Sequence, residues 1–360
     1  SDLSTAQGAT MVNEWGQRVP LDGGDVDAIL WHAAHDPEGR YRAVASRWID
    51  GQVLGPFSWL GRDRNDKNDR YDHENRRDLR GFGVWASWVD DVDTMENNTL
   101  DSYVGAADRG HVEHYQIDLG GSFGVFAAAP KLYWMSDQSY FQLDRVVGSL
   151  AGIGIVPHRW ESRRWQKRRE ALLDQYPEFG GISSEHFEPR KWRPIADTPP
   201  FVRQTERDRY WGAKRVAAFS REELKGAIAA ARYRPDAADY LLETLWRRRE
   251  AIARDGFSRV APLDHFRVEG DRLCFTDLWV RAGLGGNAAT DYRAREGDAV
   301  VDVRHGSDGS GAACVALPRK GGYRVVELAA LRPGERHFGP TVAVHLVARE
   351  GGARVVGVIR

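Results

Sequence analysis

The sequence changes character near residues 257–262, and this change sets the strongest limit on how the chain can fold. Before it, apolar residues recur at helical spacing in several segments. After it, glycine becomes frequent and the apolar residues fall in short, alternating, β-branched runs. These runs occupy residues 299–304, 323–328, 341–347 and 354–359. The pattern predicts a small antiparallel β unit over residues 261–360 that follows a mainly helical part.

The last two runs predict a β-hairpin. Gly351 and Gly352 stand between them and are typical of a tight turn. Because side chains alternate across a strand, Val342, Val344 and Leu346 should face one side and their neighbours the other. Both faces carry apolar residues, so we expect the hairpin to be central in its sheet or covered, and not a bare edge.

Length and composition indicate an ordinary globular protein. The 360 residues are enough for two or three domains, and 42% hydrophobic with 29% charged residues is typical of folded chains. Lys and Arg total 51 against 52 Asp and Glu, so no overall positive field attracts nucleic acid or anionic lipid. The basic runs 163–169 and 247–249 are typical of solvated helix faces. We therefore expect no nucleic-acid partner, and no stretch is long and apolar enough to predict a membrane span.

The two cysteines, Cys274 and Cys314, do not fix the redox environment. Cys274 alternates with apolar neighbours, which predicts a buried free thiol, with a single disulfide as the alternative. Residues 1–10 lack the apolar core of a signal peptide, yet the chain is compatible with the mature part of an exported precursor. The compartment stays open, and we favour an extracytoplasmic, bacterial location over a cytoplasmic one.

Local sequence signals predict the helices and strands of the part that precedes residues 257–262. Ser220 with Glu223 forms a capping-box pattern, and Gly256 predicts a helix stop. Residues 125–210 are rich in aromatic residues, Pro and Gly, and are expected to be mostly irregular. The predicted elements are a helix from Asp25 to about residue 35, a strand over 40–49, a helix from Asp72 to Val89, strands over 99–104 and 112–117, and helices over 220–232 and 236–256.

An acidic loop follows the predicted helix that ends at Val89. Asp93 and Asn98 stand five apart on it, and Asp118, followed by Leu119 and Gly120, comes at the end of the second predicted strand. This order of helix, D-x-x-x-x-N loop, hairpin and D-x-G matches the catalytic segment of phosphoryl-transfer enzymes. That chemistry needs a carboxylate to take the proton of the acceptor hydroxyl and hard oxygen ligands for magnesium. We assign the proton to Asp93 and the metal to Asn98 and Asp118, and expect all three to converge on one cleft.

Both motifs are short, and Asp and Asn are also favoured as turn and cap residues. A wider resemblance adds specificity. Residues 12–260 resemble a group of bacterial proteins with an atypical kinase-like core, distantly similar to the HipA toxin kinases and the spore-coat CotH kinases. The resemblance lies, in the expected order, in residues 40–47, 54–57, 73–81, 98–101, 114–120 and 210–214.

The resemblance implies an α+β fold in which a kinase-like C-lobe, mainly helical with short β-hairpins, is followed by a small antiparallel β domain. Residues 1–60 would be a residual N-lobe or hinge-like segment, residues 61–260 the C-lobe, and residues 261–360 the β-rich domain. It also implies ATP and Mg²⁺ as cofactors of an ATP-dependent phosphotransferase.

The chain departs from the kinase pattern in two ways. Asp91 stands where the catalytic loop has a histidine, and this extra carboxylate could raise the pKa of Asp93 or bind a cation of its own. The lobe with the phosphate-binding lysine should precede the segment where this chain begins, and the only lysine before Asp93 is Lys67, in a polar loop. The chain is then a fragment, or another chain or segment supplies the lobe, or it is a non-catalytic pseudokinase or structural subunit with a protein partner.

Three other patterns are weaker. Residues 63–74 resemble a calcium loop, but Lys67 and Asn68 stand where an oxygen donor and a glycine are needed. His111 and His114 would lie on opposite faces of a strand, so we expect no metal there and expect His114 to pack near Asp118. The glycines at 283–286 lack the Lys-Ser/Thr and helix of a phosphate loop.

Overall fold

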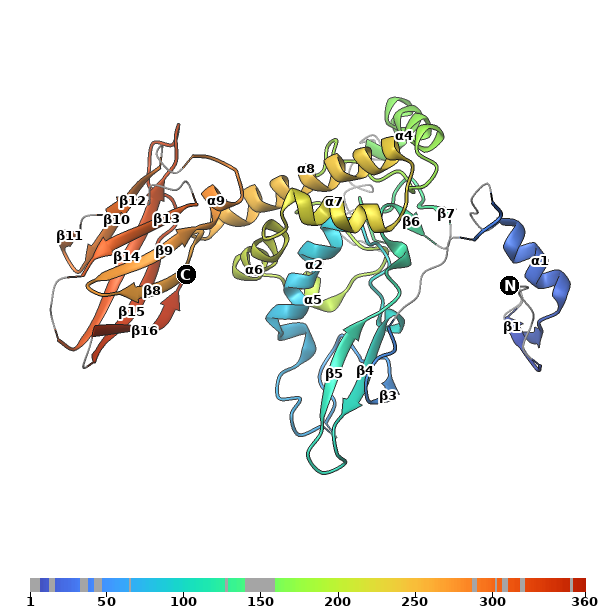
Figure 1. Ribbon diagram of the computed structural model, residues 1–360, viewed down its shortest axis with the longest axis horizontal. Coiled ribbons are helices and arrows are strands. Elements are labelled where there is room, and N and C mark those ends of the chain that lie inside the picture. The colour runs from blue at the N-terminus through green and yellow to red at the C-terminus, as the bar shows by residue number, and fades with distance from the viewer. Residues whose placement is uncertain are drawn as a thin grey trace, which may run out of the picture. The chain divides into compact units, whose positions relative to one another are not determined.

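The computed structural model confirms an α+β protein with antiparallel sheets (Figure 1). It describes residues 7–12, 17–32, 38–41, 47–64, 66–126, 129–139, 159–286, 290–301, 303–305, 310–317, 321–349 and 352–360. The chain forms two compact units, Ser1–Asp50 and Gly51–Arg360.

The described residues of the first unit form a short hairpin and one helix. Strands β1 (Thr10–Val12) and β2 (Arg18–Pro20) pair antiparallel, and α1 (Gly23–His32) follows. Asp22 and Asp25 accept a hydrogen bond from each other's backbone N–H, both at 3.0 Å, so the cap is Asp22 rather than the predicted Asp25. The strand predicted over 40–49 lies mostly outside the described residues, and residues 47–49 are not in a strand.

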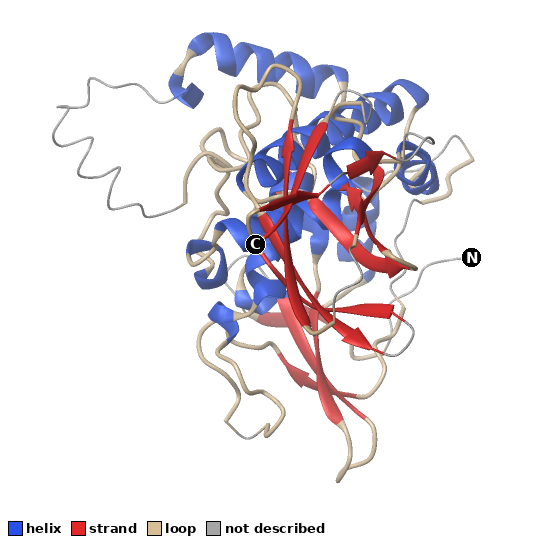
Figure 2. Cartoon of the chain, turned by 90° about the vertical axis from the view of Figure 1, so that its left-hand side faces the viewer, coloured by secondary structure: helices blue, strands red, loops and turns tan. Residues whose placement is uncertain are grey.

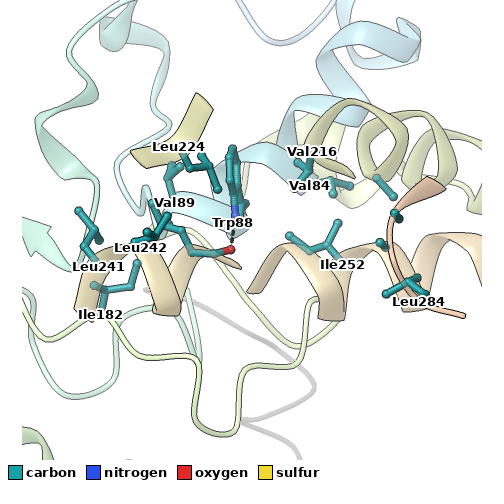
Figure 3. Packing of buried hydrophobic residues seen from close by; sticks show 14 of the residues in the cluster. Val84, Trp88, Val89, Ile182, Val216, Leu224, Leu241, Leu242, Ile252 and Leu284 are labelled. Atoms are coloured by element: carbon teal, nitrogen blue, oxygen red, sulfur yellow. Dashed lines mark hydrogen bonds between the residues drawn. The ribbon is translucent and has the colours of Figure 1, made fainter. Parts of the chain in front are cut away.

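The second unit begins with a helical part built around α2 and α8. Figure 3 shows Val84, Trp88 and Val89 of α2 in one apolar cluster with Leu241, Leu242 and Ile252 of α8. The Trp88 indole N–H donates to the Leu245 carbonyl at 2.9 Å. The helices are α2 (Arg77–Val89), α4 (Arg163–Gln175), α5 (Pro199–Val202), α6 (Glu206–Ala217), α7 (Arg221–Ala230) and α8 (Pro235–Arg259).

Several of these helices were anticipated and others were not. Helix α2 ends at Val89 as predicted, but a 3₁₀ turn, His73–Asn75, precedes it in place of the first helical turn. The capping box of Ser220 and Glu223 is present at the start of α7. The expectation of irregular structure over 125–210 is wrong for α4 and for the start of α6, whose helical faces carry too few apolar residues to stand out.

Helix α8 corrects two predictions. Gly256 lies inside this helix and does not end it. A glycine is needed at this position because α6 crosses so closely that a Cβ on Gly256 would lie 2.4 Å from the Ala213 Cβ. Arg248 and Arg249 are buried rather than solvated. Arg248 donates to the Ser87 and Trp88 carbonyls at the end of α2, and Arg249 donates to the Ala217 carbonyl at the end of α6, so each closes a helix terminus.

A small three-stranded sheet leads into and out of the acidic loop. It consists of β3 (Gln52–Gly55), β4 (Thr99–Val104) and β5 (His111–Gln116) in the order β3-β4-β5. The antiparallel pair β4–β5 confirms the two predicted strands to within one residue. A two-residue pair, β6 (Val125–Phe126) with β7 (Ala129–Pro130), comes later.

Two antiparallel sheets form the rest of the chain, and Figure 2 shows their strands in red. They share one apolar core, in which Leu273 and Phe275 meet Val326 and Leu328. One sheet has the order β12-β13-β9-β8 and the other β11-β10-β14-β15-β16. The elements are β8 (Leu263–Glu269), β9 (Arg272–Asp277), α9 (Leu278–Arg281), β10 (Asp291–Glu296), β11 (Ala299–Val301), β12 (Val303–His305), β13 (Ala312–Ala316), β14 (Tyr323–Leu331), β15 (Val342–Arg349) and β16 (Gly352–Ile359).

The change from helix to strand falls between Arg259 and Leu263, inside the interval predicted from the sequence. Because the compact unit runs over Gly51–Arg360, the division into domains at about residue 260 stays a prediction. The hairpin β15–β16 is confirmed, and Val342, Val344 and Leu346 are fully buried on one face as expected. Its position was predicted wrongly, since β16 is an edge strand with an exposed apolar side chain at Val356, Val358 and Ile359.

Cys274 and Cys314 form a disulfide, so the prediction of a buried free thiol was wrong. The two residues lie 40 apart in sequence but directly opposite each other on β9 and β13. The alternation around Cys274 reports its burial correctly, while the partner depends on a strand pairing that the local pattern does not contain.

The crossing of α6 and α8 can be tested with a pair of glycine substitutions. Gly256→Ala should lower the free energy of unfolding by about 1–3 kcal/mol, because the added methyl group overpacks the contact with Ala213. Gly226→Ala is the matched control, since Gly226 lies in α7 with no atom within 4 Å of the added Cβ. It should raise stability by about 0.5–1 kcal/mol. Urea unfolding measures both, and equal effects of the two substitutions would contradict the close crossing.

Candidate functional site

The candidate site begins at a left-handed turn that ends α2. Asp90 has φ 60° and ψ 39° and is buried. Its carboxylate accepts from Ser136 Oγ at 2.6 Å and from the Trp192 indole N–H at 2.9 Å, and it is paired with Lys131. Burial opposes the charge, but Lys131 and Arg248 outweigh this and hold the pKa of Asp90 far below its usual range. Asp90 is thus a fully compensated buried anion.

The next residue has the opposite environment. Asp91 is 0% exposed, and neither carboxylate oxygen has a hydrogen-bond partner. Burial raises the pKa of Asp91 to about 7, helped by the charges of Asp93, Asp90 and Asp118 and opposed by the nearby Asp93 backbone N–H. Gly121 lies directly against it, since a Cβ there would be 3.0 Å from Asp91 Oδ1 and 3.0 Å from the Asp93 Cβ.

Asp93 and Asn98 are held together within the loop. The Asn98 side-chain amide is buried and donates to the Asp93 carbonyl at 2.7 Å. Asp93 itself is half-buried, and its Oδ1 is a buried atom without a partner. Burial raises the pKa of Asp93, the Asp118 charge raises it further, and Asn98 opposes the shift. The loop thus holds a carboxyl group with a raised affinity for a proton.

Asp118 completes the group from the other side. It is exposed, adopts a left-handed conformation with φ 48°, and accepts from the Gly120 N–H at 3.3 Å at the start of a 3₁₀ turn. Backbone hydrogen bonds from Val92 N–H to the Gly121 carbonyl and from Phe123 N–H to the Val89 carbonyl tie this turn to the acidic loop. The three residues that the motifs singled out therefore belong to one locality, with Asp118 at its solvent side.

The spacing of these side chains suits a hydrated hard cation better than a cation that the carboxylates coordinate directly. Carboxylate and amide oxygens suit Mg²⁺, and Asp91 and Asp93 carry buried oxygens that lack a partner. Over the described part of the chain, however, the one set of three His, Cys, Asp or Glu side chains with ligand atoms all within 4.8 Å is Glu269, Cys274 and Cys314, whose sulfurs form the disulfide. Water molecules between ion and carboxylates would bridge this spacing, as Mg²⁺ usually retains several.

Lys131 and Trp192, which hold Asp90, were not found by sequence reasoning. Both come from the region predicted to be irregular, and they lie 41 and 102 residues from Asp90. No short motif joins residues that far apart. The available signal was the adjacent pair Asp90 and Asp91, because two neighbouring acids at the end of a buried helix cannot both be left without a counter-charge.

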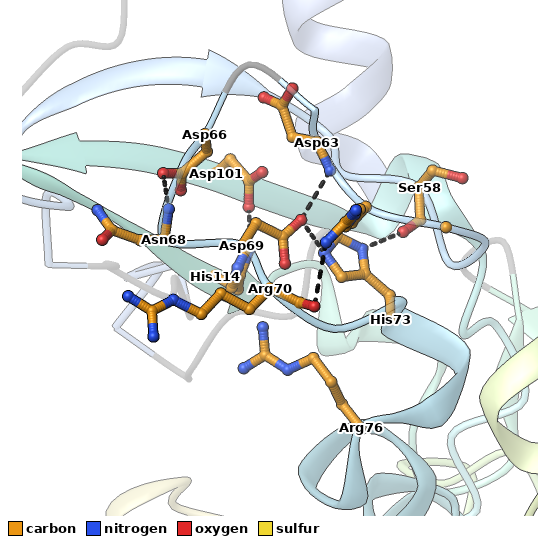
Figure 4. Close-up of polar contacts among 12 residues, drawn as sticks. Ser58, Asp63, Asp66, Asn68, Asp69, Arg70, His73, Arg76, Asp101 and His114 are labelled. Carbon is orange, nitrogen blue, oxygen red and sulfur yellow. Dashed lines mark hydrogen bonds and ion pairs between the residues drawn. The ribbon is translucent and has the colours of Figure 1, made fainter.

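A second polar cluster lies beside β4 and β5 (Figure 4). His73 bonds Asp69 at 3.0 Å, His114 bonds Asp101 at 2.5 Å, and the two imidazole rings are 5.3 Å apart. His114 is thus paired with Asp101, in place of the expected packing near Asp118. In the loop that resembles a calcium site, Asp69 accepts the backbone N–H of Asp63 at 2.7 Å. These contacts join the segment before α2 to the β4–β5 hairpin.

No family model, curated protein or solved structure matches this chain. The resemblance to atypical kinases therefore stays a hypothesis that depends on the residues themselves. Across the part of the chain that the structure describes, no helix has both the length and the apolar character needed to cross a membrane.

The contrast between the adjacent acids gives a pH-dependent prediction. The folded pKa of Asp91 is raised, so wild-type stability should fall as pH rises from about 4 to 7, where the folded protein loses a proton that the unfolded chain has already lost. Asp91→Asn should therefore stabilise the protein at pH 8 in EDTA, by at most about 4 kcal/mol, and the gain should vanish below pH 4.

Asp90→Asn is the matched control at the neighbouring position. It should destabilise the protein by about 3–5 kcal/mol at pH 8, because it leaves buried cations without their counter-charge. Thermal and urea unfolding at pH 4 and 8 measure both variants. Destabilisation by Asp91→Asn at pH 8 would show that its charge is compensated after all.

Proposed function

We propose that this protein is an atypical kinase-like phosphotransferase that uses Mg²⁺ and ATP. The observation that carries the proposal is the grouping of Asp91, Asp93 and Asp118, in which buried carboxylate oxygens of Asp91 and Asp93 lack partners and burial, with neighbouring charges, raises the pKa of Asp91 and of Asp93. Perturbed carboxylates without partners are more typical of a functional site than of a structural one. The order of helix, loop, hairpin and 3₁₀ turn supports the same assignment.

The proposed roles follow from the environment of each residue. Asp93 is the base, because a half-buried carboxyl with a raised pKa can accept the proton of an acceptor hydroxyl. Asn98 uses its amide nitrogen within the loop, which leaves its oxygen as the atom that can bind a cation. Asp118, at the solvent side, is the second ligand. Mg²⁺, when bound, would neutralise the charge on the transferred phosphoryl group.

The remaining contacts to the nucleotide would come from another chain or from a segment beyond the described residues. Lys67, the only lysine before Asp93, is exposed in a loop and is not assigned to the phosphates. Such a partner would contribute the kinase N-lobe that the resemblance implies.

One observation favours a second candidate function, a non-catalytic scaffold or pseudokinase that docks a protein partner. The three carboxylates do not gather as closely as direct metal ligands do. In this alternative the carboxyl groups of Asp91 and Asp93 serve no metal, and the site binds no cation.

The disulfide bears on the compartment. Disulfides persist in oxidising surroundings, and Cys274–Cys314 joins neighbouring strands of the β region. It supports our proposal of an extracytoplasmic location.

Cation binding separates the two functions. Titration of Mn²⁺ followed by electron paramagnetic resonance should show one bound ion for the wild-type chain. Asp93→Asn and Asp118→Asn should each weaken binding by about tenfold or more, because each removes one anionic oxygen donor. Asp239→Asn, an exposed change on α8, is the control and should leave binding unchanged. A folded wild-type protein that binds no Mn²⁺, or binds it equally after both site substitutions, would overturn the catalytic proposal in favour of the scaffold.

A further inference from the structure

A second polar site lies at the other carboxylate of the adjacent pair. Asp90 lines a pocket of about 260 Å³ together with Lys131, Ser136, Arg169 and Arg248. This volume is small for a drug-sized ligand and suits a compact group of a few heavy atoms. The walls come from the turn after α2, the segment around residue 131, α4 and α8, so the pocket is built by elements distant in sequence.

The buried charges of this pocket do not balance. Lys131, Arg169 and Arg248 are 9%, 8% and 4% exposed, and Asp90 is the single buried carboxylate among the lining residues. Buried charges are normally paired, since an uncompensated charge in a medium of low polarity is costly. The lining therefore carries an excess of buried positive charge.

Neutral oxygens satisfy the hydrogen bonds of the arginines without cancelling their charge. Arg248 donates to the carbonyls of Ser87, Trp88 and Ser183. Arg169 donates to the Gly180 carbonyl at 3.3 Å and to the Lys131 carbonyl. Arg248 reaches Asp90 only at 3.7 Å. The guanidinium groups are thus fixed in place while their charge stays available.

The acids at the rim do not supply the missing counter-charge. Glu185 pairs with Arg168 at 2.8 Å and Glu188 pairs with Lys191 at 2.8 Å, both at the exposed edge. Asp137, half-buried, is the remaining acid of the lining. It is one carboxylate against the excess, so a positive field persists inside the pocket.

One buried donor has no acceptor. The Arg169 Nε is buried and makes no hydrogen bond, on a side chain held 5.0 Å from the Tyr133 ring. Lys131 Nζ donates to Asp90 and Ser136, which uses two of its three protons. Burial lowers the pKa values of Lys131 and Arg169, and for Lys131 the neighbouring arginines add to the effect. An oxygen-rich anion would accept these protons and relieve the repulsion.

We propose that this pocket binds a small dianionic oxyanion of the phosphate type. A phosphate offers several acceptor oxygens to the Arg169 Nε–H and the third proton of Lys131, and its negative charge offsets the excess of buried positive charge. The group is either free phosphate or the phosphate of a small phosphorylated compound. The proposed anion site uses none of the side chains of the acidic group around Asp93, and anion binding there does not require a bound cation.

The test uses the full chain with inorganic phosphate as the probe and EDTA present, so that no metal contributes. Isothermal titration should give a Kd on the order of 0.1–1 mM for wild type. Arg169→Met should weaken binding at least tenfold. Arg164→Met, an exposed arginine on the same helix, is the matched control and should leave affinity unchanged. Arg169→Lys should retain part of the affinity, because it keeps the charge.

A second measurement needs no variant. Phosphate at 10 mM should raise the Tm of wild type by several degrees, whereas acetate at equal ionic strength should not, because ligand that binds the native state stabilises it. O-phosphoserine in place of phosphate distinguishes the two sources. A larger rise in Tm than with phosphate would indicate a small phosphorylated compound, and a smaller rise would indicate free phosphate. Equal effects of phosphate and acetate would overturn the proposal. So would loss of phosphate binding on Asp93→Asn, which would place the anion at the acidic group instead.

Discussion

The buried Asp90 carboxylate is the interaction on which the rest of the structure depends. It joins the end of α2 to Lys131 and Ser136, to Trp192 and, through Arg248, to α8. Lys131, Trp192 and Arg248 are buried, so removing the anion leaves cations that repel one another, and removing the cations leaves an unsolvated anion. Apart from α4, most of the described residues between β5 and α6 lie in loops, and this network, with Arg169, holds them in place where no helix or sheet does.

The same network sets the geometry of the acidic group. Because Asp90 is fixed in a left-handed conformation, the chain turns sharply and Asp91 faces Gly121 rather than the pocket. Asp118 and Phe123 also have positive φ values, so the less favourable backbone conformations concentrate where the partnerless carboxyl oxygens lie. Such strain persists only when surrounding packing holds it, and the apolar contacts of Trp88 and Val89 with α8 provide this. The cost of the site is thus offset by the helical core next to it.

Sequence reasoning succeeded where the information is local. The periodicity of α2, the capping box of α7, the β4–β5 pair and the alternation in β15 are all signals carried by neighbouring stretches of sequence. It failed where a residue's role is decided by a distant partner. Gly256 was assigned to a helix end because the residues next to it in sequence do not reveal its contact with Ala213. Arg248, Cys274 and Lys131 were misjudged or missed for the same reason, as each acts through a residue at least 40 positions away.

The two proposed sites share the peptide that joins Asp90 to Asp91, and this makes them electrostatically coupled. The Asp90 charge already raises the pKa of Asp91, so charge on one side is felt on the other. The positive charges of Lys131, Arg169 and Arg248 make the electrostatic potential at the acidic group less negative. A dianion bound in the pocket would offset these charges. The acidic group would then become more negative and attract a cation more strongly. By linkage, a cation at Asp93 and Asp118 would strengthen anion binding by the same factor. The coupling is favourable because Asp90 faces the anion pocket and Asp91 faces the acidic group, so the two bound ions, of opposite charge, lie on either side of one turn.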